Sequence, residues 1–271
     1  MIPTIVLVVL FVVGGYAVVN HIVPGVGPQA CRITVGGQTF SYEPEQAQNA
    51  ATITAIGMRR KLPHRAVTIA LATAMQESKL RNLDHGDRDS LGLFQQRPSQ
   101  GWGTPAQLQD PVYATEKFYD HLVKVRGYLD RPLTEVAQDV QRSGFPDAYA
   151  RHEERADLLM QVFTGQVPAA VVCRLNDAGR SGSAEETAAE MKAEFGISPA
   201  VSGRDVTGVL SSTELAWAAA HWSVAHAART GATRVTVGDR TWTRSDGPGA
   251  MRWSPTDDAG PTTLTVSLRR R

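Results

Sequence analysis

The chain opens with a long apolar run. Residues 2–23 contain no Asp, Glu, Lys or Arg, and the first side chain that is charged at neutral pH is Arg32. About 20 apolar residues are enough to span the hydrocarbon core of a bilayer. We therefore expect residues 1–24 to form a transmembrane anchor or signal-anchor. A cleaved signal peptide is the alternative, but the run lacks a basic start and a clear cleavage site.

Apolar residues then recur at helical spacing. Residues 25–44 indicate a linker and a short extended segment, with a turn expected at Gly36-Gly37. A helix is predicted over residues 43–63, and a proline then begins a second helix over residues 63–77. The second helix is apolar on nearly every side, which is typical of a helix buried in the centre of a domain.

The same spacing predicts further helices, and alternation at period two predicts strands near the end of the chain. Small polar residues at 175–185 separate the two patterns and indicate a linker. The helices are expected over residues 111–129, 133–143, 146–165 and 212–231, and the strands over residues 233–244 and 262–270.

These patterns predict a fold class and a division into domains. The chain has 271 residues, which exceeds the usual length of one domain. We expect an α-rich domain after an N-terminal transmembrane helix, plus a small C-terminal α/β domain. The predicted parts are an anchor at residues 1–24, a linker and extended segment at 25–44, the α-rich domain at 45–173, a linker at 174–190 and the α/β accessory domain at 191–271.

The balance of charge argues against a nucleic-acid partner. The chain has 28 Lys and Arg residues against 27 Asp and Glu residues, a formal net charge of +1. Binding to nucleic acids relies on an excess of positive charge. Any anionic ligand must therefore be recognised by local groups.

The candidate chemistry begins at the end of the second helix. Glu77 stands there, after the apolar residues Ala74 and Met75. Burial raises the pKa of a carboxyl group, and a carboxyl that stays protonated near neutral pH can donate a proton to the leaving oxygen of a glycosidic bond. Glu77 is therefore a candidate general acid, and a solvated carboxylate at a helix end is the alternative.

A second motif follows in the next segment. Residues 90–95 read SLGLFQ and come after Glu77-Ser78 in chain order. The two motifs resemble those of the lytic transglycosylase and goose-type lysozyme superfamily, in which a helix ends in Glu-Ser and a Ser-x-Gly-Leu-x-Gln segment lines the saccharide cleft. The resemblance covers about residues 45–165 and implies a lysozyme-like fold for the α-rich domain.

The resemblance implies cleavage of the MurNAc-GlcNAc strand of peptidoglycan, as a lytic transglycosylase or a lysozyme-type muramidase. Glu77 would act first as proton donor and then as base, with Tyr149 facing it from the opposite wall. Trp102 is a further candidate because indole rings stack on sugars, and Gln96 is another; for both, core packing is the alternative. The expected substrate-binding residues are Ser90, Gly92, Gln95, Gln96, Trp102 and Tyr149.

Nearby carboxylates leave the type of reaction open. Inverting hydrolases use a second carboxylate to activate water, whereas lytic transglycosylases need one Glu and let a hydroxyl of the substrate attack. Asp84, Asp87 and Asp89 could supply that second carboxylate or could hold a turn. His85 is not accompanied by an HExxH or CxxC pattern. We therefore expect no metal ion and no cofactor.

The third motif of the superfamily is incomplete in this chain. The superfamily has Ala-Tyr-Asn where this chain has Ala148-Tyr149-Ala150. Two alternatives to an active enzyme therefore stay open. One is a catalytically weak or inactive membrane protein that binds wall glycan, and the other is a tethered scaffold for a protein partner.

The C-terminal part joins the helical segment ELAWAAAHWSVAHAA to the closing strand TTLTVSLRR. It resembles a degenerate wall-associated relative of zinc D-alanyl-D-alanine peptidases, whose last strand carries a His-x-His pair. Residues 262–268 contain no histidine, and His221 and His226 are five residues apart on a predicted helix, so they point in different directions. The resemblance implies a non-catalytic accessory or wall-targeting module.

The chain has two cysteines, Cys31 and Cys173, which bracket the α-rich domain. Disulfides form in oxidising compartments such as the cell exterior. We predict a disulfide between them, with two free buried thiols as the alternative. Together with the expected anchor and substrate, this predicts a single-pass protein of the cell membrane whose soluble domains face the wall.

Overall fold

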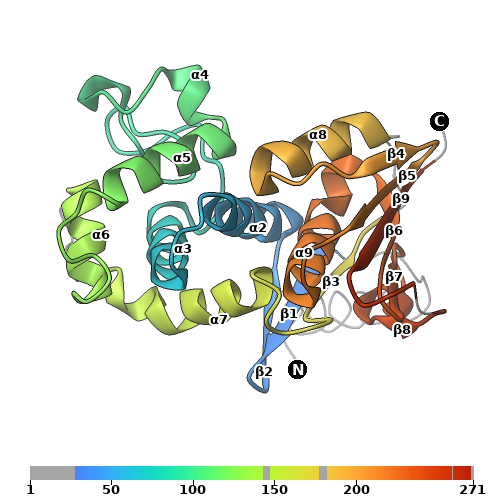
Figure 1. The fold of residues 1–271 in the computed structure, drawn as a ribbon. Coiled ribbons are helices and arrows are strands. Elements are labelled where there is room, and N and C mark those ends of the chain that lie inside the picture. Colours follow the sequence, from blue (N-terminus) through green and yellow to red (C-terminus); the bar gives the residue numbers. More distant parts are fainter. Residues whose placement is uncertain (1–27, 143–146, 177–181, 258, 270–271) are drawn as a thin grey trace, which may run out of the picture.

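The computed structural model describes residues 28–142, 147–176, 182–257 and 259–269. Of these residues, 46% are helical and 19% lie in strands. In Figure 1, helices α3 to α7 lie on one side of the molecule and a sheet with β4 to β9 on the other. Helices α2, α8 and α9 lie between them.

The described chain begins with a hairpin. β1 (Ala30–Val35) and β2 (Gln38–Tyr42) pair antiparallel around Gly36 and Gly37. The φ angles of these two glycines, +58° and +74°, lie in the left-handed region that a two-residue hairpin turn requires. Alternate residues of β1 are buried, and β3 (Val171–Arg174) pairs with its other edge to complete a sheet of order β2-β1-β3.

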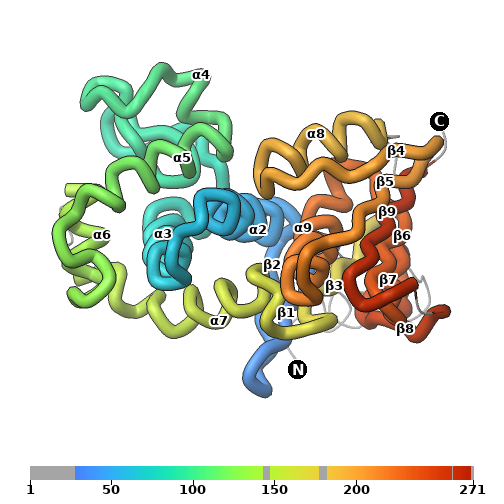
Figure 2. Tube along the Cα trace, viewed as in Figure 1, coloured from blue at the N-terminus to red at the C-terminus, as the bar shows by residue number. Residues whose placement is uncertain are grey.

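A disulfide links the two strands of this sheet that lie furthest apart in sequence. Cys31 of β1 and Cys173 of β3 are direct partners across the strand pair, with their Cα atoms 4.0 Å apart. Figure 2 shows the hairpin and β3 converging, although 142 residues separate the two cysteines. The predicted disulfide is confirmed.

α3 (His64–Ser78) is the central helix of the helical part, and it matches the helix predicted over residues 63–77. It packs against α2, α5, α6 and α7, which surround it in Figure 1. The surrounding helices are α2 (Pro44–Arg59), α4 (Pro105–Leu108), α5 (Pro111–Leu122), α6 (Leu133–Gln141) and α7 (Glu153–Phe163), with short 3-10 turns at Pro98–Gln100 and Ala150–His152.

The C-terminal part is an antiparallel sheet of order β4-β5-β9-β6-β7-β8 covered on one face by α9. α9 contacts β6 and β9 of this sheet and also β3 of the first sheet. The elements are α8 (Ala184–Phe195), β4 (Ala200–Ser202), β5 (Asp205–Val209), α9 (Thr213–Thr230), β6 (Ala232–Val237), β7 (Arg240–Thr243), a 3-10 turn at Pro248–Met251, β8 (Ser254–Pro255) and β9 (Thr263–Leu268).

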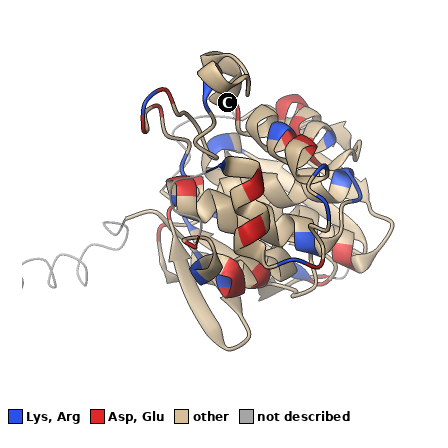
Figure 3. Cartoon of the chain, turned by 90° about the vertical axis from the view of Figure 1, so that its left-hand side faces the viewer, with Lys and Arg blue, Asp and Glu red and all other residues tan. Residues whose placement is uncertain are grey.

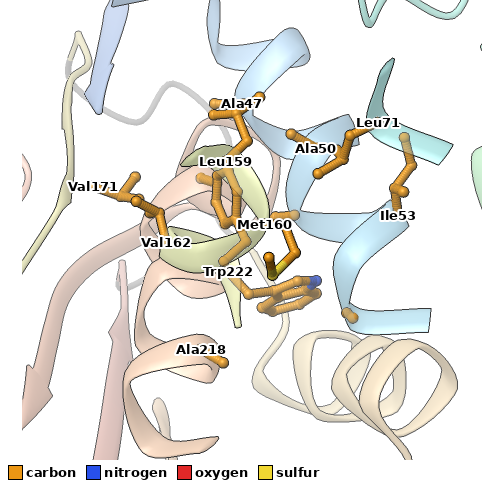
Figure 4. Close-up of a cluster of buried hydrophobic side chains, with 14 of the residues drawn as sticks. Ala47, Ala50, Ile53, Leu71, Leu159, Met160, Val162, Val171, Ala218 and Trp222 are labelled. Atoms are coloured by element: carbon orange, nitrogen blue, oxygen red, sulfur yellow. The ribbon is translucent and has the colours of Figure 1, made fainter. Parts of the chain in front are cut away.

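The helical and C-terminal parts share one hydrophobic core. α9 packs along α2, and α7 lies against both. Figure 4 shows Trp222 of α9 in the same cluster as Met160 of α7 and Ile53 of α2. All three side chains are almost completely buried. Burial of this kind is the dominant stabilising contribution in a fold, so the two parts stabilise each other.

The predicted fold class was wrong. We expected an α-rich, lysozyme-like domain behind a transmembrane helix, with a small α/β domain after it. The described residues instead form a mixed α/β arrangement, because residues 30–42 and 171–174 build a sheet on the helical part. Within the described ranges, no helix has the length and apolar character needed to cross a membrane. The segment expected to be an anchor, residues 1–24, lies outside the described residues.

Charged side chains of both signs are interspersed on the face shown in Figure 3. Ion pairs among the described residues include Arg60 with Asp120 at 3.0 Å and Arg131 with Asp139 at 2.7 Å. This face therefore presents no extended field of one sign.

Candidate active site

Helix α3 carries Glu77 to the edge of the helical part. Residues 66–75 of the helix are buried, and Gln76 and Glu77 in its last turn are partly exposed. The helix ends where Lys79 adopts the left-handed conformation, with φ +57°. The hydroxyl of Ser78 donates to the carbonyl oxygen of Leu93 at 2.8 Å. That bond attaches the end of α3 to the loop that carries the second motif.

Glu77 is half-buried and hydrogen-bonded. The hydroxyl of Tyr149, a fully buried residue, donates to Oε1 of Glu77 at 2.6 Å. Burial raises the pKa of Glu77, and hydrogen bonds from Tyr149 and Gln141 offset part of that rise. The pKa stays above its usual value. The Glu77 carboxyl therefore keeps its proton to a higher pH than an exposed Glu does.

The loop with the second motif is closed by its own backbone. Leu91 and Gln96 exchange two backbone hydrogen bonds of 3.0 Å each. Between them, Gly92 has φ +76° and Gln95 has φ +49°. A Cβ atom at Gly92 would collide with the carbonyl oxygen of Leu108. Both the backbone conformation and the close approach therefore require glycine at this position.

Gln141 connects this loop to the glutamate. Its Nε2 donates to the carbonyl oxygen of Phe94 at 2.7 Å, and the same side chain is hydrogen-bonded to Glu77. Gln141 is the last residue of α6. The sequence does not predict this contact, because the residue pattern of α6 does not indicate which other helix its last residue meets.

Trp102 lies in a pocket that Gln141 also lines. The indole ring stacks on the imidazole of His121, with ring centroids 4.1 Å apart, and 8% of the residue is exposed. The pocket measures about 420 Å³. Glu77 is not a lining residue, and Gln141 is the residue that connects it to the pocket. Its lining residues are Gln100, Trp102, His121, Asp139, Val140, Gln141 and Arg142.

The other residues predicted to bind substrate do not all lie in the same environment. Ser90 and Gly92 lie in the loop beside the end of α3. The amide of Gln95 donates within the same loop, to the carbonyl oxygen of Gly92 at 3.1 Å. Gln96 is 2% exposed and donates to the carbonyl oxygen of Ala114 at 3.1 Å. The structure thus turns Gln96 into the core, and of the predicted substrate-binding residues Tyr149 is the one with a hydrogen bond to Glu77.

The three aspartates differ in what they contact. Asp89 accepts hydrogen bonds from the backbone N–H of Ser99 and from the guanidinium of Arg97, both at 2.8 Å. These bonds hold the pKa of Asp89 well below its usual range. Asp84 and Asp87 are exposed. A turn-holding role therefore accounts for Asp89, and in the described part of the chain no hydrogen bond joins any of the three to Glu77.

Basic residues follow Tyr149 in a 3-10 turn. Oε1 of Gln76, the neighbour of Glu77, accepts from Arg151 at 2.8 Å and lies 3.1 Å from Nε2 of His152. Burial lowers the pKa of His152, and the charges of Arg151 and Arg155 lower it further. These side chains border a second pocket of about 320 Å³. It is lined by Gln38, Phe40, Arg151, His152, Glu154, Arg155 and Leu158.

The two histidines of α9 are fully buried, and both pack in the core. His221 contacts the carbonyl oxygen of Val162, and His226 contacts that of Trp222, each through Nδ1 at 2.9 Å. Among the residues that the structure describes, no group of three His, Cys, Asp or Glu side chains is arranged to hold a metal ion.

No protein-family model matches the chain, and no curated protein matches it.

Proposed function

We propose that the protein is a glycosidase that cleaves the MurNAc-GlcNAc strand of peptidoglycan, with Glu77 as its only general acid and base. One observation carries the proposal: the Glu77 carboxyl is half-buried, has a raised pKa and accepts a hydrogen bond from Tyr149. The resemblance of the Glu-Ser and Ser-x-Gly-Leu-x-Gln motifs to those of lytic transglycosylases supports it, because Ser78 and Leu93 bring the two motifs together.

The first step is proton donation. The protonated carboxyl of Glu77 gives its proton to the glycosidic oxygen, and the bond between that oxygen and the anomeric carbon breaks. A raised pKa favours this step because a larger fraction of the carboxyl is protonated near neutral pH. The hydroxyl of Tyr149 holds the carboxyl in place and stabilises the carboxylate that remains.

The second step uses the same residue as a base. The Glu77 carboxylate takes a proton from a hydroxyl of the substrate, which attacks the anomeric carbon and leaves an anhydro-sugar. Asp89 is already bonded to Ser99 and Arg97, so it is poorly placed to activate water. The proposal therefore favours transglycosylation over hydrolysis.

We propose that this reaction takes place outside the cytoplasmic membrane. Peptidoglycan lies there, and the Cys31–Cys173 disulfide is stable in an oxidising compartment. Protease added to intact spheroplasts should therefore digest the protein. Full protection of the protein from that protease would contradict this location.

The test compares the full-length protein with Glu77→Gln. Gln keeps the shape of the side chain but cannot donate a proton, so glycan cleavage should fall by about 10²–10⁴-fold. Purified peptidoglycan is digested, and mass spectrometry quantifies anhydro-muropeptides and reducing-end products. Glu135→Gln is the matched control, because Glu135 lies on the surface of α6 and pairs with Arg131; it should retain wild-type activity.

Undiminished cleavage by Glu77→Gln would remove Glu77 from the mechanism. Reducing-end products without anhydro-sugars would show that the protein is a glycosidase in which water, and not a hydroxyl of the substrate, attacks the anomeric carbon. If the wild-type protein binds sacculi and releases no fragment, the non-enzymatic glycan-binding alternative takes its place.

A further inference from the structure

A third pocket, of about 600 Å³, lies between the first sheet and the C-terminal part. It contains no residue that contacts Glu77 and none that lines the two pockets near it. We call it the arginine pocket. It is lined by Arg32, Thr34, Pro168, Ala169, Ala170, Val172, Trp217, Asp239, Arg240, Met251, Arg252 and Trp253.

The charged groups of the arginine pocket are mostly positive. Asp239 is the only acidic residue in the lining, and it lies 3.5 Å from Nε of Arg240. The side chains of Arg32 and Arg252 form no hydrogen bond or ion pair with any residue that the structure describes. Two guanidinium groups at one pocket thus have no ion-pair partner among the described residues. Guanidinium groups bind carboxylates and phosphates through paired hydrogen bonds.

Two tryptophans form the inner wall. The rings of Trp217 and Trp253 meet edge to face, with centroids 5.2 Å apart, and the residues are 7% and 9% exposed. The indole N–H of Trp253 donates to the carbonyl oxygen of Val171 at 2.9 Å. The N–H of Trp217 has no acceptor among the described residues. This N–H is open to solvent, because it is not one of the fully enclosed polar atoms that lack a partner among the described residues, so it can donate to a ligand in place of water.

The pocket wall includes a strained residue. Ala169 has φ +56°, in the left-handed region that residues other than glycine and asparagine rarely adopt. Such strain persists only where surrounding contacts hold it, and it is concentrated at functional sites. The contacts come from His221, whose Nδ1–H donates to Val162 and whose Nε2 accepts the N–H of Ala170 at 3.2 Å.

Burial lowers the pKa of His221 to about 4. The ring is therefore neutral near pH 7, which leaves Nε2 free to accept from Ala170. The loop wall is held in one conformation before any ligand arrives. A preformed wall reduces the entropy that is lost when a ligand binds.

We infer that the arginine pocket binds a small organic anion that presents a phosphate or carboxylate group to Arg32 and Arg252. The pocket volume is in the range of small-molecule sites. The guanidinium groups and the Trp217 N–H supply donors to the anion, and Met251 and Val172 offer apolar contact to its body. This site is independent of the chemistry proposed for Glu77.

The test measures binding to the full-length protein by nuclear magnetic resonance and calorimetry. The probes are glycerol 3-phosphate and succinate, with glycerol as the uncharged control. The indole N–H resonance of Trp217, assigned by comparison with Trp217→Phe, should shift in a saturable manner with one or both anions and not with glycerol. The anion that binds more tightly identifies whether phosphate or carboxylate is preferred.

Arg32→Gln and Arg252→Gln should each weaken binding by about ten-fold or more, because each removes charge-assisted hydrogen bonds. Both side chains are exposed, so these variants should fold. Arg126→Gln, at an exposed arginine outside the pocket, and Glu77→Gln should bind the anions as the wild type does. No saturable shift at millimolar concentrations of either anion, or equal weakening by Arg126→Gln, would overturn the inference.

Discussion

The proton affinity of Glu77 depends on opposing contributions from its neighbours. Burial disfavours the carboxylate and raises the pKa, whereas the hydrogen bonds from Tyr149 and Gln141 stabilise the carboxylate and lower it. The proposed role of Glu77 as acid and then base needs this balance, because either extreme of pKa would block one of the two proposed steps. The two hydrogen-bonding residues are therefore positioning residues for Glu77.

Tyr149→Phe tests this balance through the pH dependence of cleavage. Removing the hydroxyl removes a hydrogen bond that favours the carboxylate, so the pKa of Glu77 should rise further. The protonated form is the proton donor, and activity falls as pH rises through this pKa. The alkaline limb of the profile should therefore move to higher pH, with a lower maximum rate. An unchanged limb would show that Tyr149 does not tune Glu77.

Gly92 offers a second test at the residue scale. Gly92→Ala should lower the free energy of unfolding by roughly 2–4 kcal/mol, because the new Cβ meets the Leu108 carbonyl in addition to the cost of a left-handed backbone. Gly101→Ala is the matched control, since Gly101 has φ +80° and open space around it. It should cost only about 1–2 kcal/mol. Urea denaturation measures both, and equal losses would contradict the close approach.

Three helices meet at a buried polar group. Trp222 of α9 donates its indole N–H to Oε2 of Glu194 in α8 at 2.6 Å. Nε2 of His226 lies 3.7 Å from Oε1 of Glu194 and 3.3 Å from the hydroxyl of Thr52 in α2. Because these contacts join α2, α8 and α9, they set how the helical part packs on the C-terminal part.

Glu194→Gln should therefore destabilise the fold by about 3–5 kcal/mol at neutral pH, as expected when one partner of a buried pair is lost. Burial raises the pKa of Glu194, but His226 and hydrogen bonds from Trp222 and Thr52 lower it by more, so the pKa is lowered from 4.5. The stability from the ionised form is complete above about pH 4.5 and is lost as pH falls through the lowered pKa. The difference between variant and wild type should shrink accordingly.

Glu190→Gln is the control on the same helix. Glu190 forms a surface ion pair with Arg229, and such pairs contribute about 1 kcal/mol or less. Unfolding measured from pH 7 to pH 3 separates the two variants. A loss in Glu194→Gln that matches the control, or that is constant with pH, would contradict a structural role for the buried carboxylate.

At the scale of the whole molecule, one core and one disulfide connect distant parts of the chain. Trp222, Met160 and Ile53 belong to three helices of a single hydrophobic cluster. The Cys31–Cys173 disulfide links β1 and β3 of the first sheet, against which the helical part packs. We expect the helical and C-terminal parts to unfold together, because neither can separate without exposing this core.

Reduction of the disulfide tests the contribution of the covalent link. The loop that it closes spans 142 residues, for which loss of chain entropy in the unfolded state predicts up to about 4–5 kcal/mol of stabilisation. Thermal unfolding with and without reductant should show a clearly lower Tm for the reduced protein. A double variant, Cys31→Ser with Cys173→Ser, should have the Tm of the reduced protein, and reductant should not change that Tm. Equal Tm values for both forms, with reduction verified by mass spectrometry, would contradict this.

Local patterns predicted several elements and the candidate acid. The helix expected over residues 63–77 is α3, and that over residues 212–231 is α9, because apolar spacing is contained within each segment. The place of Glu77 at the end of α3 followed from the same spacing. The disulfide could be predicted because the chain has only two cysteines.

Only the tertiary structure decided which distant segments meet. β1 pairs with β3, Gln141 of α6 reaches Glu77 of α3, and Arg32 lines a pocket with Arg252. Gln96 directly follows the Ser-x-Gly-Leu-x-Gln motif and was a further candidate for a saccharide contact, yet its amide donates to a backbone carbonyl in the core. Periodicity is set by neighbours a few residues away, whereas these contacts depend on the packing of segments up to 220 residues apart. The sequence therefore determined several elements and the position of the candidate acid Glu77, whereas packing determined the contacts of Glu77, the first sheet and the arginine pocket.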